Sequence, residues 1–290
     1  MRAMVTGGTG FIGSALVKEL LNQGNEVACL VRQGSTTKRI SNVTYIEDSE
    51  SQAQLTQAFL SFGPDVVFHL AACQDLTNTL DGAKELLETN LYFGSRVLIA
   101  ASDSGAKSFI SAGTFSTHAT GTSEFVPQTF YASTKIAFMN LCEFFATTTS
   151  MKTLVLELSD TYGPKDPRVK FLNLISQFSK SGETIGATAG EQFIRPLHVE
   201  DVVSGFIHAA KLHLSGRKLD LVLSLAGAEE VNLKELVKIF ESATGRKVNV
   251  TWGERPYRKN EIMKPYVGNQ LPDWKPAISL AQGLAQVFSD

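Results

Sequence analysis

The stretch Val5-Thr6-Gly7-Gly8-Thr9-Gly10-Phe11-Ile12-Gly13 decides the fold expected for this chain. Residues 1–5 predict a short strand, and the apolar residues of 11–21 recur at helical spacing before a stop at Gly24. The glycines therefore lie in a turn from a strand into a helix. Gly7 permits a tight turn, Gly10 lets backbone N–H groups approach a pyrophosphate, and Gly13 permits close packing of helix on strand. An anion would bind at the helix N-terminus, beside Phe11 and Ile12. We therefore expect a dinucleotide site rather than an ordinary glycine turn.

Composition narrows the class of protein. The chain has 290 residues, of which 43% are hydrophobic and 19% charged, which suits one large domain or a main domain with a smaller lobe. The net charge of -2 gives no support to binding of nucleic acid or of an anionic membrane surface. Cys29, Cys73 and Cys142 lack CxxC spacing, so neither a metal site nor a disulfide framework is indicated. Reduced thiols, no signal peptide and no apolar run long enough to span a bilayer predict a cytoplasmic protein.

Strand and helix patterns alternate through the first half, which predicts an α/β fold: a Rossmann-like, doubly wound parallel sheet. The expected strands cover residues 27–31, 43–46, 66–70, 108–111 and 153–158, with helices at 52–62, 80–102 and 131–145. We assign residues 1–164 to a nucleotide-binding domain that includes the helix of Tyr131. Residues 165–290 are expected to form mainly a smaller substrate-binding lobe, with some segments returning to the main domain. Its expected elements are 171–178, 199–210, 219–225, 231–243, 248–252 and 280–287.

The end of the second strand indicates which nucleotide binds. A sheet built for NAD usually places an acidic side chain here, on the adenosine ribose hydroxyls. This chain has Arg32 instead, with Lys38 and Arg39 nearby, and such positive charge suits the 2′-phosphate of NADP. The alternative is a solvated loop arginine. Asp48, at the end of the third strand, is placed either to accept a hydrogen bond from the adenine amino group or to cap a helix.

Small residues follow the fourth strand. Leu70, Ala71 and Ala72 let the backbone pass close to the cofactor. His69 lies in an apolar run that buries its strand, so we interpret it as structural rather than catalytic.

Tyr131 and Lys135 are the catalytic candidates. A spacing of four residues places both side chains on one helix face. A nearby ammonium group stabilises a phenolate and lowers the tyrosine pKa, which makes a usable general acid/base. The same lysine can hold a ribose of the cofactor. The fifth strand ends at Thr114, which would bring that hydroxyl beside the tyrosine, although threonine at a strand end is commonly structural.

Taken together, these residues resemble the extended short-chain dehydrogenase/reductase family of sugar-nucleotide epimerases, dehydratases and reductases. The resemblance covers essentially the whole chain. It also includes Asn90, Tyr162-Gly163-Pro164, Arg195 with His198-Val199-Glu200-Asp201, and residues 271–276. It implies a bound nicotinamide nucleotide, with Asn90 at the cofactor site, and a Thr114/Tyr131/Lys135 centre acting on a sugar C–OH or C=O. It further implies that Arg195 and an arginine of the 255–258 segment clamp a diphosphate, and Arg258 fits the pattern better than Arg255.

Departures from the family pattern narrow the reaction. Thr114-Phe115-Ser116 lacks the acidic residue of the dehydratases and decarboxylases, and elimination of water needs an extra acid/base pair. Related epimerase/reductases use a Cys/His pair, but no cysteine lies near Thr114, although His118 does. UDP-galactose 4-epimerases carry an aspartate where this chain has Val31. The usual Arg-x-x-Asn before Tyr-Gly-Pro is here Glu157-Leu158-Ser159-Asp160, which puts one diphosphate contact in doubt.

Residues 160–171 are similar to the CDP-paratose and CDP-abequose synthases, which reduce the C4 ketone of CDP-linked deoxysugars. In this segment Arg168 and Lys170 either contact phosphate or form a solvated basic face. The sequence thus predicts an NADP-dependent 4-ketoreductase of a 4-keto-6-deoxy sugar nucleotide in surface polysaccharide biosynthesis. The alternatives are a sugar-nucleotide 4-epimerase and a non-catalytic NADP-binding sensor or scaffold. Expected partners are a sugar nucleotide, with no nucleic-acid polymer and no membrane, and a homodimer is compatible with the sequence.

Overall fold

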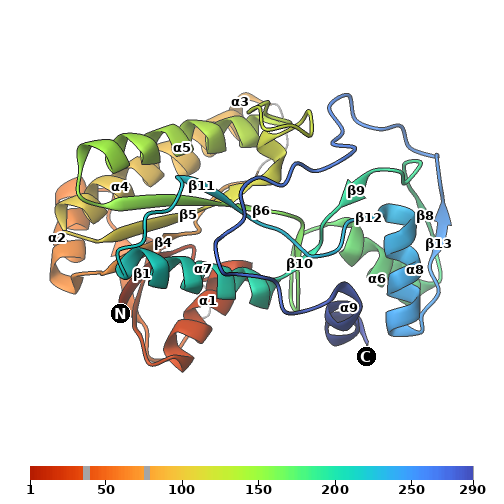
Figure 1. Cartoon of the computed structure of the whole chain (residues 1–290), viewed down its shortest axis with the longest axis horizontal. Coiled ribbons are helices and arrows are strands. Elements are labelled where there is room, and N and C mark those ends of the chain that lie inside the picture. The colour runs from red at the N-terminus through yellow and green to blue at the C-terminus, as the bar shows by residue number, and fades with distance from the viewer. Residues whose placement is uncertain (35–39, 75–78, 290) are drawn as a thin grey trace.

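A seven-stranded parallel sheet forms the centre of the molecule in the computed structural model (Figure 1). The structure describes residues 1–34, 40–74 and 79–289. The strand order is β11-β6-β5-β4-β1-β2-β3, so the chain builds outward from β1 in both directions. In a doubly wound sheet the ligand crevice lies where the strand order reverses, beyond the carboxyl ends of the strands. The strands are β1 (Arg2–Thr6), β2 (Glu26–Arg32), β3 (Thr44–Asp48), β4 (Val66–His69), β5 (Ser108–Thr114), β6 (Lys152–Leu158) and β11 (Val222–Leu225).

Helices cover both faces of this sheet (Figure 1). On one face α1 (Phe11–Asn22) and α7 (Val199–Leu214) enclose an apolar cluster with the strands. On the other face lie α2 (Gln52–Phe62), α4 (Gly94–Asp103) and α5 (Phe130–Thr148). Because both faces are buried, the central strands are nearly continuous apolar runs.

A π-helical segment joins two of these helices. The single helix expected over residues 80–102 is divided into three parts in the structure. They are α3 (Leu80–Leu87), the π-helical segment η1 (Glu88–Phe93) and α4. Such segments occur mostly as single turns within α-helices, often at functional sites. The sequence pattern of period 3.6 did not indicate it.

The C-terminal lobe has its own core. It contains α6 (Phe171–Ser181), α8 (Leu233–Thr244) and α9 (Leu280–Phe288), which pack around residues such as Ile175, Leu236, Phe240 and Leu284. Three pairs of short strands join the parts of this half of the chain. They are β7 (Thr161–Tyr162) with β10 (Leu197–His198), β8 (Thr184–Gly186) with β13 (Asn249–Thr251), and β9 (Phe193–Ile194) with β12 (Val231–Asn232).

Two later segments cross back to the main domain. The strand β11 pairs with β6, and α7 covers the sheet beside α1. After β13 the chain returns along the sheet, where Ser224 N donates to Asn269 O (2.8 Å) and Trp274 Nε1 donates to Ser204 Oγ (2.9 Å) (Figure 1). The two lobes are therefore held together by several chain crossings.

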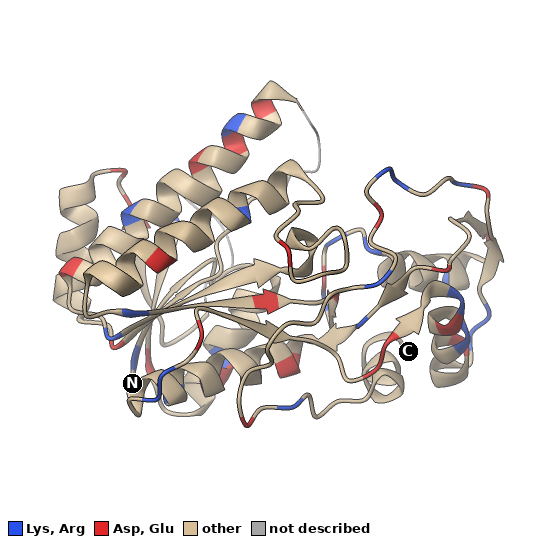
Figure 2. Cartoon of the chain, turned by 45° about the horizontal axis from the view of Figure 1, so that its top comes forward, with Lys and Arg blue, Asp and Glu red and all other residues tan. Residues whose placement is uncertain are grey.

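Charged residues of both signs are interspersed over the two lobes (Figure 2). No described helix is long and apolar enough to cross a membrane. Within residues 1–34, 40–74 and 79–289, no cluster of His, Cys, Asp and Glu is arranged to hold a metal ion.

Candidate active site

The glycine turn after β1 leads directly into α1 and packs closely on the loop after β4. Gly7 has φ +69°, and a Cβ there would lie 2.6 Å from the Ala71 nitrogen, so the turn and the β4 loop touch closely. A Cβ on Gly13 would lie 2.0 Å from the Gly7 oxygen. Gly10 is the N-cap of α1 and has no capping side chain, so the N–H groups that follow are left for an external acceptor. A dinucleotide pyrophosphate fits these features.

The loop after β4 is tied to the same turn. Thr6 Oγ1 accepts from Ala71 N (3.2 Å) and is hydrogen-bonded to His69 Nδ1 (2.9 Å). Burial lowers the pKa of His69 to about 3, so its ring is neutral, and it packs against Phe109 and Phe138. These contacts agree with the structural role expected for His69. Leu70, Ala71 and Ala72 follow β4 directly, at the carboxyl edge of the sheet.

Asn90 lies in η1 and is only 2% exposed. Its Oδ1 accepts from Cys73 N (2.9 Å), and its Nδ2 donates to Cys73 O and Thr134 Oγ1 (both 3.0 Å). The amide thus holds the β4 loop against α5. The role of Asn90 at a cofactor site stays a prediction.

The ends of β2 and β3 lie side by side, with Arg32 opposite Asp48 in the register. The Arg32 side chain is exposed and belongs to none of the ion pairs among the described residues. Lys38 and Arg39 lie outside the described residues.

Asp48 is already bound within the protein. Its carboxylate makes two 2.9 Å hydrogen bonds to Arg96 of α4. The helix-cap alternative for Asp48 is wrong, because Ser51 caps α2 by accepting from Gln54 N. Asp48 Oδ1 also accepts from Glu50 N (3.1 Å), whereas Oδ2 keeps a second lone pair, so the adenine contact stays a prediction.

Tyr131 and Lys135 lie at the start of α5, which Thr129 caps. The two side chains are 9% and 8% exposed. Lys135 Nζ donates to Ala112 O of β5 (3.0 Å) and lies 5.8 Å from the Tyr131 ring centroid. Thr114 ends the same strand, and its Oγ1 lies 2.8 Å from Ser116 Oγ. The structure therefore brings the three residues to one strand end and one helix start.

The electrostatic expectation for this pair needs correction. In the protein alone, burial raises the pKa of Tyr131 to about 12, whereas a lowered value was expected. Lys135 does not counteract this effect, since its ammonium is directed at the Ala112 carbonyl and burial lowers its own pKa to about 8. The cation that opposes the rise is Arg168.

Arg168 and Lys170 are not a solvated basic face, so that alternative is wrong. Arg168 makes two 2.7 Å bonds to Asp166 and one of 2.9 Å to Thr161 O, and its guanidinium lies 4.8 Å from the Phe11 ring centroid. Lys170 Nζ lies 3.7 Å from Asp160 Oδ1. Arg168 thus joins the first turn of α1 to the segment after Tyr162-Gly163-Pro164.

The two arginines expected on the diphosphate differ in setting. Arg195 follows β9, and its Nε and Nη1 contact Glu230 (3.1 Å) and the Gly227 carbonyl (3.4 Å). Arg258 is exposed in the segment after β13. No contact joins the two arginines within the described residues, so a shared diphosphate clamp stays a prediction.

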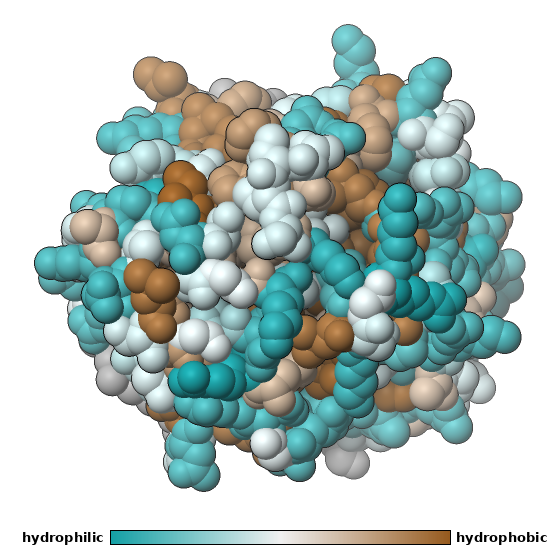
Figure 3. All heavy atoms as spheres, turned by 60° about the vertical axis from the view of Figure 1, so that its left-hand side comes forward, coloured by the Kyte–Doolittle hydropathy of each residue, from teal (hydrophilic) through white to brown (hydrophobic). Residues whose placement is uncertain are grey.

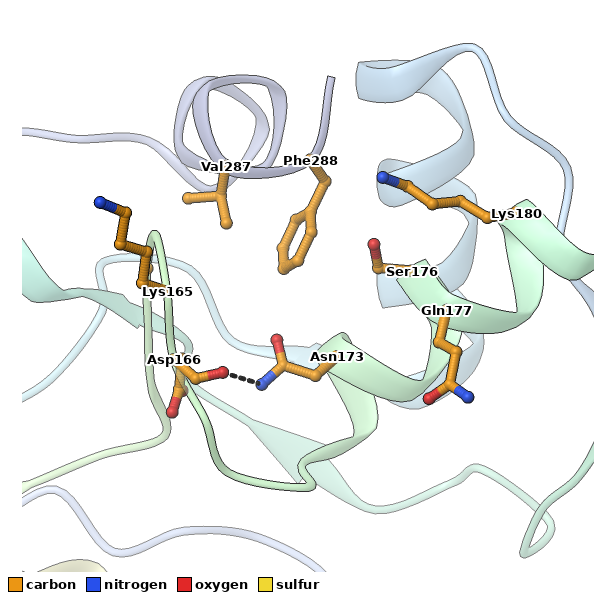
Figure 4. A pocket seen from close by; sticks show the side chains of 9 residues that line it. Lys165, Asp166, Asn173, Ser176, Gln177, Lys180, Val287 and Phe288 are labelled. Atoms are coloured by element: carbon orange, nitrogen blue, oxygen red, sulfur yellow. Dashed lines mark hydrogen bonds between the residues drawn. The ribbon is translucent and has the colours of Figure 1, made fainter. Parts of the chain in front are cut away.

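A hollow of about 300 Å³ lies on the C-terminal lobe between the end of α9, α6 and the segment after Tyr-Gly-Pro (Figure 4). Lys165 and Lys180 lie at opposite ends of it, with Phe288 between them. It contains none of Thr114, Tyr131 and Lys135, so we do not assign the reaction to it.

Comparison with known proteins identifies the family. Residues 3–222 match the NAD dependent epimerase/dehydratase family, and the chain belongs to it. It is 27% identical to an uncharacterised UDP-glucose epimerase of Bacillus subtilis (98% of this chain, 96% of the relative). It is 26% identical to CDP-abequose synthase of Yersinia pseudotuberculosis (91% and 92%). The fold resembles UDP-glucose 4-epimerase of Thermotoga maritima, with a TM-score of 0.86 at 24% identity (99% and 97%).

Sequence reasoning missed two features of this site, the Asp48–Arg96 pair and a buried pair of His118 and Glu157. A charged residue within an apolar strand, as Glu157 is in β6, could have indicated the second.

Proposed function

We propose that this protein is an NADP-dependent reductase of the C4 ketone of a 4-keto-6-deoxy sugar nucleotide. We take that nucleotide to be CDP and the pathway to be surface polysaccharide biosynthesis. The observation that carries the proposal is the buried pair Tyr131 and Lys135 at the start of α5, with Lys135 Nζ bound to the Ala112 carbonyl two residues before the end of β5 at Thr114. The exposed Arg32 at the end of β2 supports NADP over NAD.

Each residue has a defined part in this reaction. The turn at Gly7, Gly10 and Gly13 and the start of α1 hold the pyrophosphate, and Arg32 pairs with the 2′-phosphate. The bound nucleotide supplies hydride chemistry at its nicotinamide. Tyr131 gives its phenol proton to the ketone oxygen, and the Thr114 hydroxyl donates a hydrogen bond to the same oxygen. Lys135 orients a ribose of the bound nucleotide, and Arg168 is the cation that opposes the rise of the Tyr131 pKa caused by burial.

The proposed substrate class rests on differences from the family pattern that argue against the other reactions of the family. Dehydration needs a further acid/base pair, which Phe115 and Ser116 beside Thr114 do not provide. The identity with CDP-abequose synthase supports a CDP-linked deoxysugar. Arg195 and Arg258 are proposed to bind its diphosphate.

Turnover of a CDP-4-keto-6-deoxy sugar tests the proposal. We expect one NADPH to be consumed for each C4 alcohol formed, with NADPH much preferred over NADH. Interconversion of C4 epimers without net consumption of NADPH would instead favour a 4-epimerase; the Bacillus subtilis relative is named a UDP-glucose epimerase. Tight binding of NADPH with no turnover would favour the sensor or scaffold.

A homodimer is part of the same proposal. Among the described residues, Ile99 of α4 and Phe144 of α5 are exposed apolar side chains (39% and 58%). Figure 3 shows apolar side chains interspersed with polar ones on the side of the molecule where α2, α4 and α5 lie. The mass in solution, measured by light scattering, tests it.

A further inference from the structure

His118 and Glu157 form a buried pair behind the candidate catalytic threonine. His118 Nε2 lies 3.1 and 3.2 Å from the two Glu157 carboxylate oxygens. The side chains are only 3% and 4% exposed. Glu157 lies on β6 opposite Gly113 in the register, one residue before Thr114 on β5. The pair therefore lies at the carboxyl end of the central strands.

The contacts of His118 fix its protonation state. Its Nδ1 lies 3.0 Å from the Glu124 carbonyl oxygen, and its Nε2 faces the Glu157 carboxylate. Carbonyl and carboxylate oxygens only accept hydrogen bonds, so both ring nitrogens must carry a proton. Burial opposes this charge, but the bonds to Glu157 and Glu124 raise the pKa of His118 above its ordinary value. The contacts and the direction of the pKa change therefore both favour the doubly protonated, imidazolium form of His118.

Aromatic rings flank the imidazolium from two segments. The Phe125 ring centroid lies 4.9 Å from that of His118, and the Tyr266 centroid lies 4.8 Å away. Cations within this distance of an aromatic face are attracted to it. His118 therefore faces Glu157 from β6 and Tyr266 from the C-terminal segment, together with Thr122, Glu124 and Phe125 of its own loop.

The pair is directly linked to Thr114. Thr117 Oγ1 lies 2.7 Å from both the Thr114 carbonyl and Glu157 Oε1, and it can donate its proton to either. The loop that contains His118 runs from Thr114 to the start of α5, where Tyr131 lies. Gln128 N donates to Ser116 O (2.9 Å), so the two ends of this loop are joined.

The same loop contacts the segment that contains Arg258. Gln128 Nε2 donates to Asn260 O (3.0 Å), and a Cβ on Gly121 would lie 2.7 Å from Lys264 O. Tyr266, which packs on His118, belongs to that segment too. A displacement of His118 would therefore move both the end of β5 at Thr114 and the C-terminal segment that contains Tyr266.

We propose that the His118–Glu157 ion pair is a positioning device that fixes residues 115–129 and so sets the placement of Thr114 relative to Tyr131. This role rests on the proposed function. His118 is a positioning residue and not the catalytic acid, since both of its nitrogens are bound to groups of the chain itself.

Glu157→Gln tests this role, because it removes the charge while keeping the shape and an acceptor for Thr117. The matched control is Glu124→Gln, since the exposed Glu124 contacts His118 through its backbone carbonyl alone. In Glu157→Gln we expect kcat to fall roughly ten- to a hundred-fold. KM for NADPH and for the sugar nucleotide should stay within about three-fold, because the loss is confined to the reacting geometry. Glu124→Gln should match the wild type in both.

Two physical measurements accompany the kinetics. The ¹⁵N spectrum at neutral pH should show a doubly protonated His118 in the wild type and in Glu124→Gln, but a neutral ring in Glu157→Gln. Amide exchange across residues 115–129 should be faster only in Glu157→Gln. If that variant does not fold, the double variant His118→Gln with Glu157→Gln, which buries no charge, takes its place with the same expected loss of kcat.

A neutral His118 in the wild type would overturn the proposal. The proposal would also fail if Glu157→Gln has a neutral His118 ring but keeps the kcat of the wild type. Should the wild type turn over no sugar nucleotide, the proposed function fails, while the exchange measurement still decides the positioning role. Unchanged exchange in residues 115–129 would then overturn it.

Discussion

Arg32 is the residue on which the choice of cofactor depends. Its exposed guanidinium lies at the end of β2, where it can pair with a 2′-phosphate. Arg32→Ala should weaken NADPH at least about tenfold, or ~1.4 kcal/mol, and leave NADH nearly unchanged. Fluorescence titration with both nucleotides measures this. Arg217→Ala, which removes an exposed arginine paired with Asp273, is the control. Equal affinity of the wild type for NADPH and NADH would contradict the prediction.

Tyr131 carries the proposed proton transfer. Tyr131→Phe keeps the buried aromatic ring at the start of α5 and removes only the hydroxyl. We expect kcat to fall ~10²–10⁴-fold, the usual worth of a positioned acid, with NADPH affinity retained. The exposed Tyr92→Phe serves as a control. Near-full ketoreductase activity of Tyr131→Phe would show that another group is the acid.

Lys135 gives a prediction about stability and pH. Burial lowers its pKa from 10.5 to about 8. Between these two pH values the unfolded chain binds a proton at Lys135 that the folded chain does not, so wild-type stability should rise with pH there. Relative to Lys135→Met, the free energy of unfolding of the wild type should therefore increase from about pH 8 to about pH 10.5. Chemical denaturation across this range measures it, and a difference that stays constant with pH would refute the assignment.

At the scale of the element, the β1 turn can be tested with two glycines of similar φ. A Cβ added at Gly24 (φ +73°) would meet nothing within 4 Å, whereas at Gly7 (φ +69°) backbone atoms of Leu70 and Ala71 would lie within 2.9 Å of it. Gly24→Ala should lower the free energy of unfolding by about 1 kcal/mol, because only the left-handed backbone opposes the new side chain. NADPH affinity should not change. Gly7→Ala should cost at least about 2 kcal/mol and weaken NADPH, because the β4 loop must move. Denaturation curves and titration check both. Equal costs would mean that this close approach is unimportant.

At the scale of the whole molecule, Arg195 and Arg258 of the C-terminal half are predicted to bind the substrate's diphosphate together. Arg195→Ala and Arg258→Ala should each raise the sugar-nucleotide KM tenfold or more, since a lost hydrogen bond to a charged group costs about 1.5–3 kcal/mol. NADPH affinity should stay constant, because neither residue lies within residues 1–164, where the cofactor is proposed to bind. Arg195 already pairs with Glu230, and partly exposed pairs of this kind add at most ~1 kcal/mol to stability. Unchanged KM in both variants would contradict the diphosphate role and leave Arg195 with its ion pair to Glu230 alone.

The sequence by itself determined the doubly wound sheet and the main candidates for chemistry. The evidence came from local patterns: glycines with fixed spacing, apolar strands and the interval between Tyr131 and Lys135. Such patterns can be recognised without knowing which distant residues pack together. They therefore predicted β1, α1, β5 and α5 to within a few residues.

Only the tertiary structure decided the electrostatic partners. Asp48 pairs with Arg96 across 48 residues of sequence, and His118 pairs with Glu157 across 39. Lys135 faces a carbonyl of β5, and so it does not lower the Tyr131 pKa as its position four residues away suggested. The physical reason is that burial and long-range pairing set the charge of these groups, and both arise when distant segments pack together.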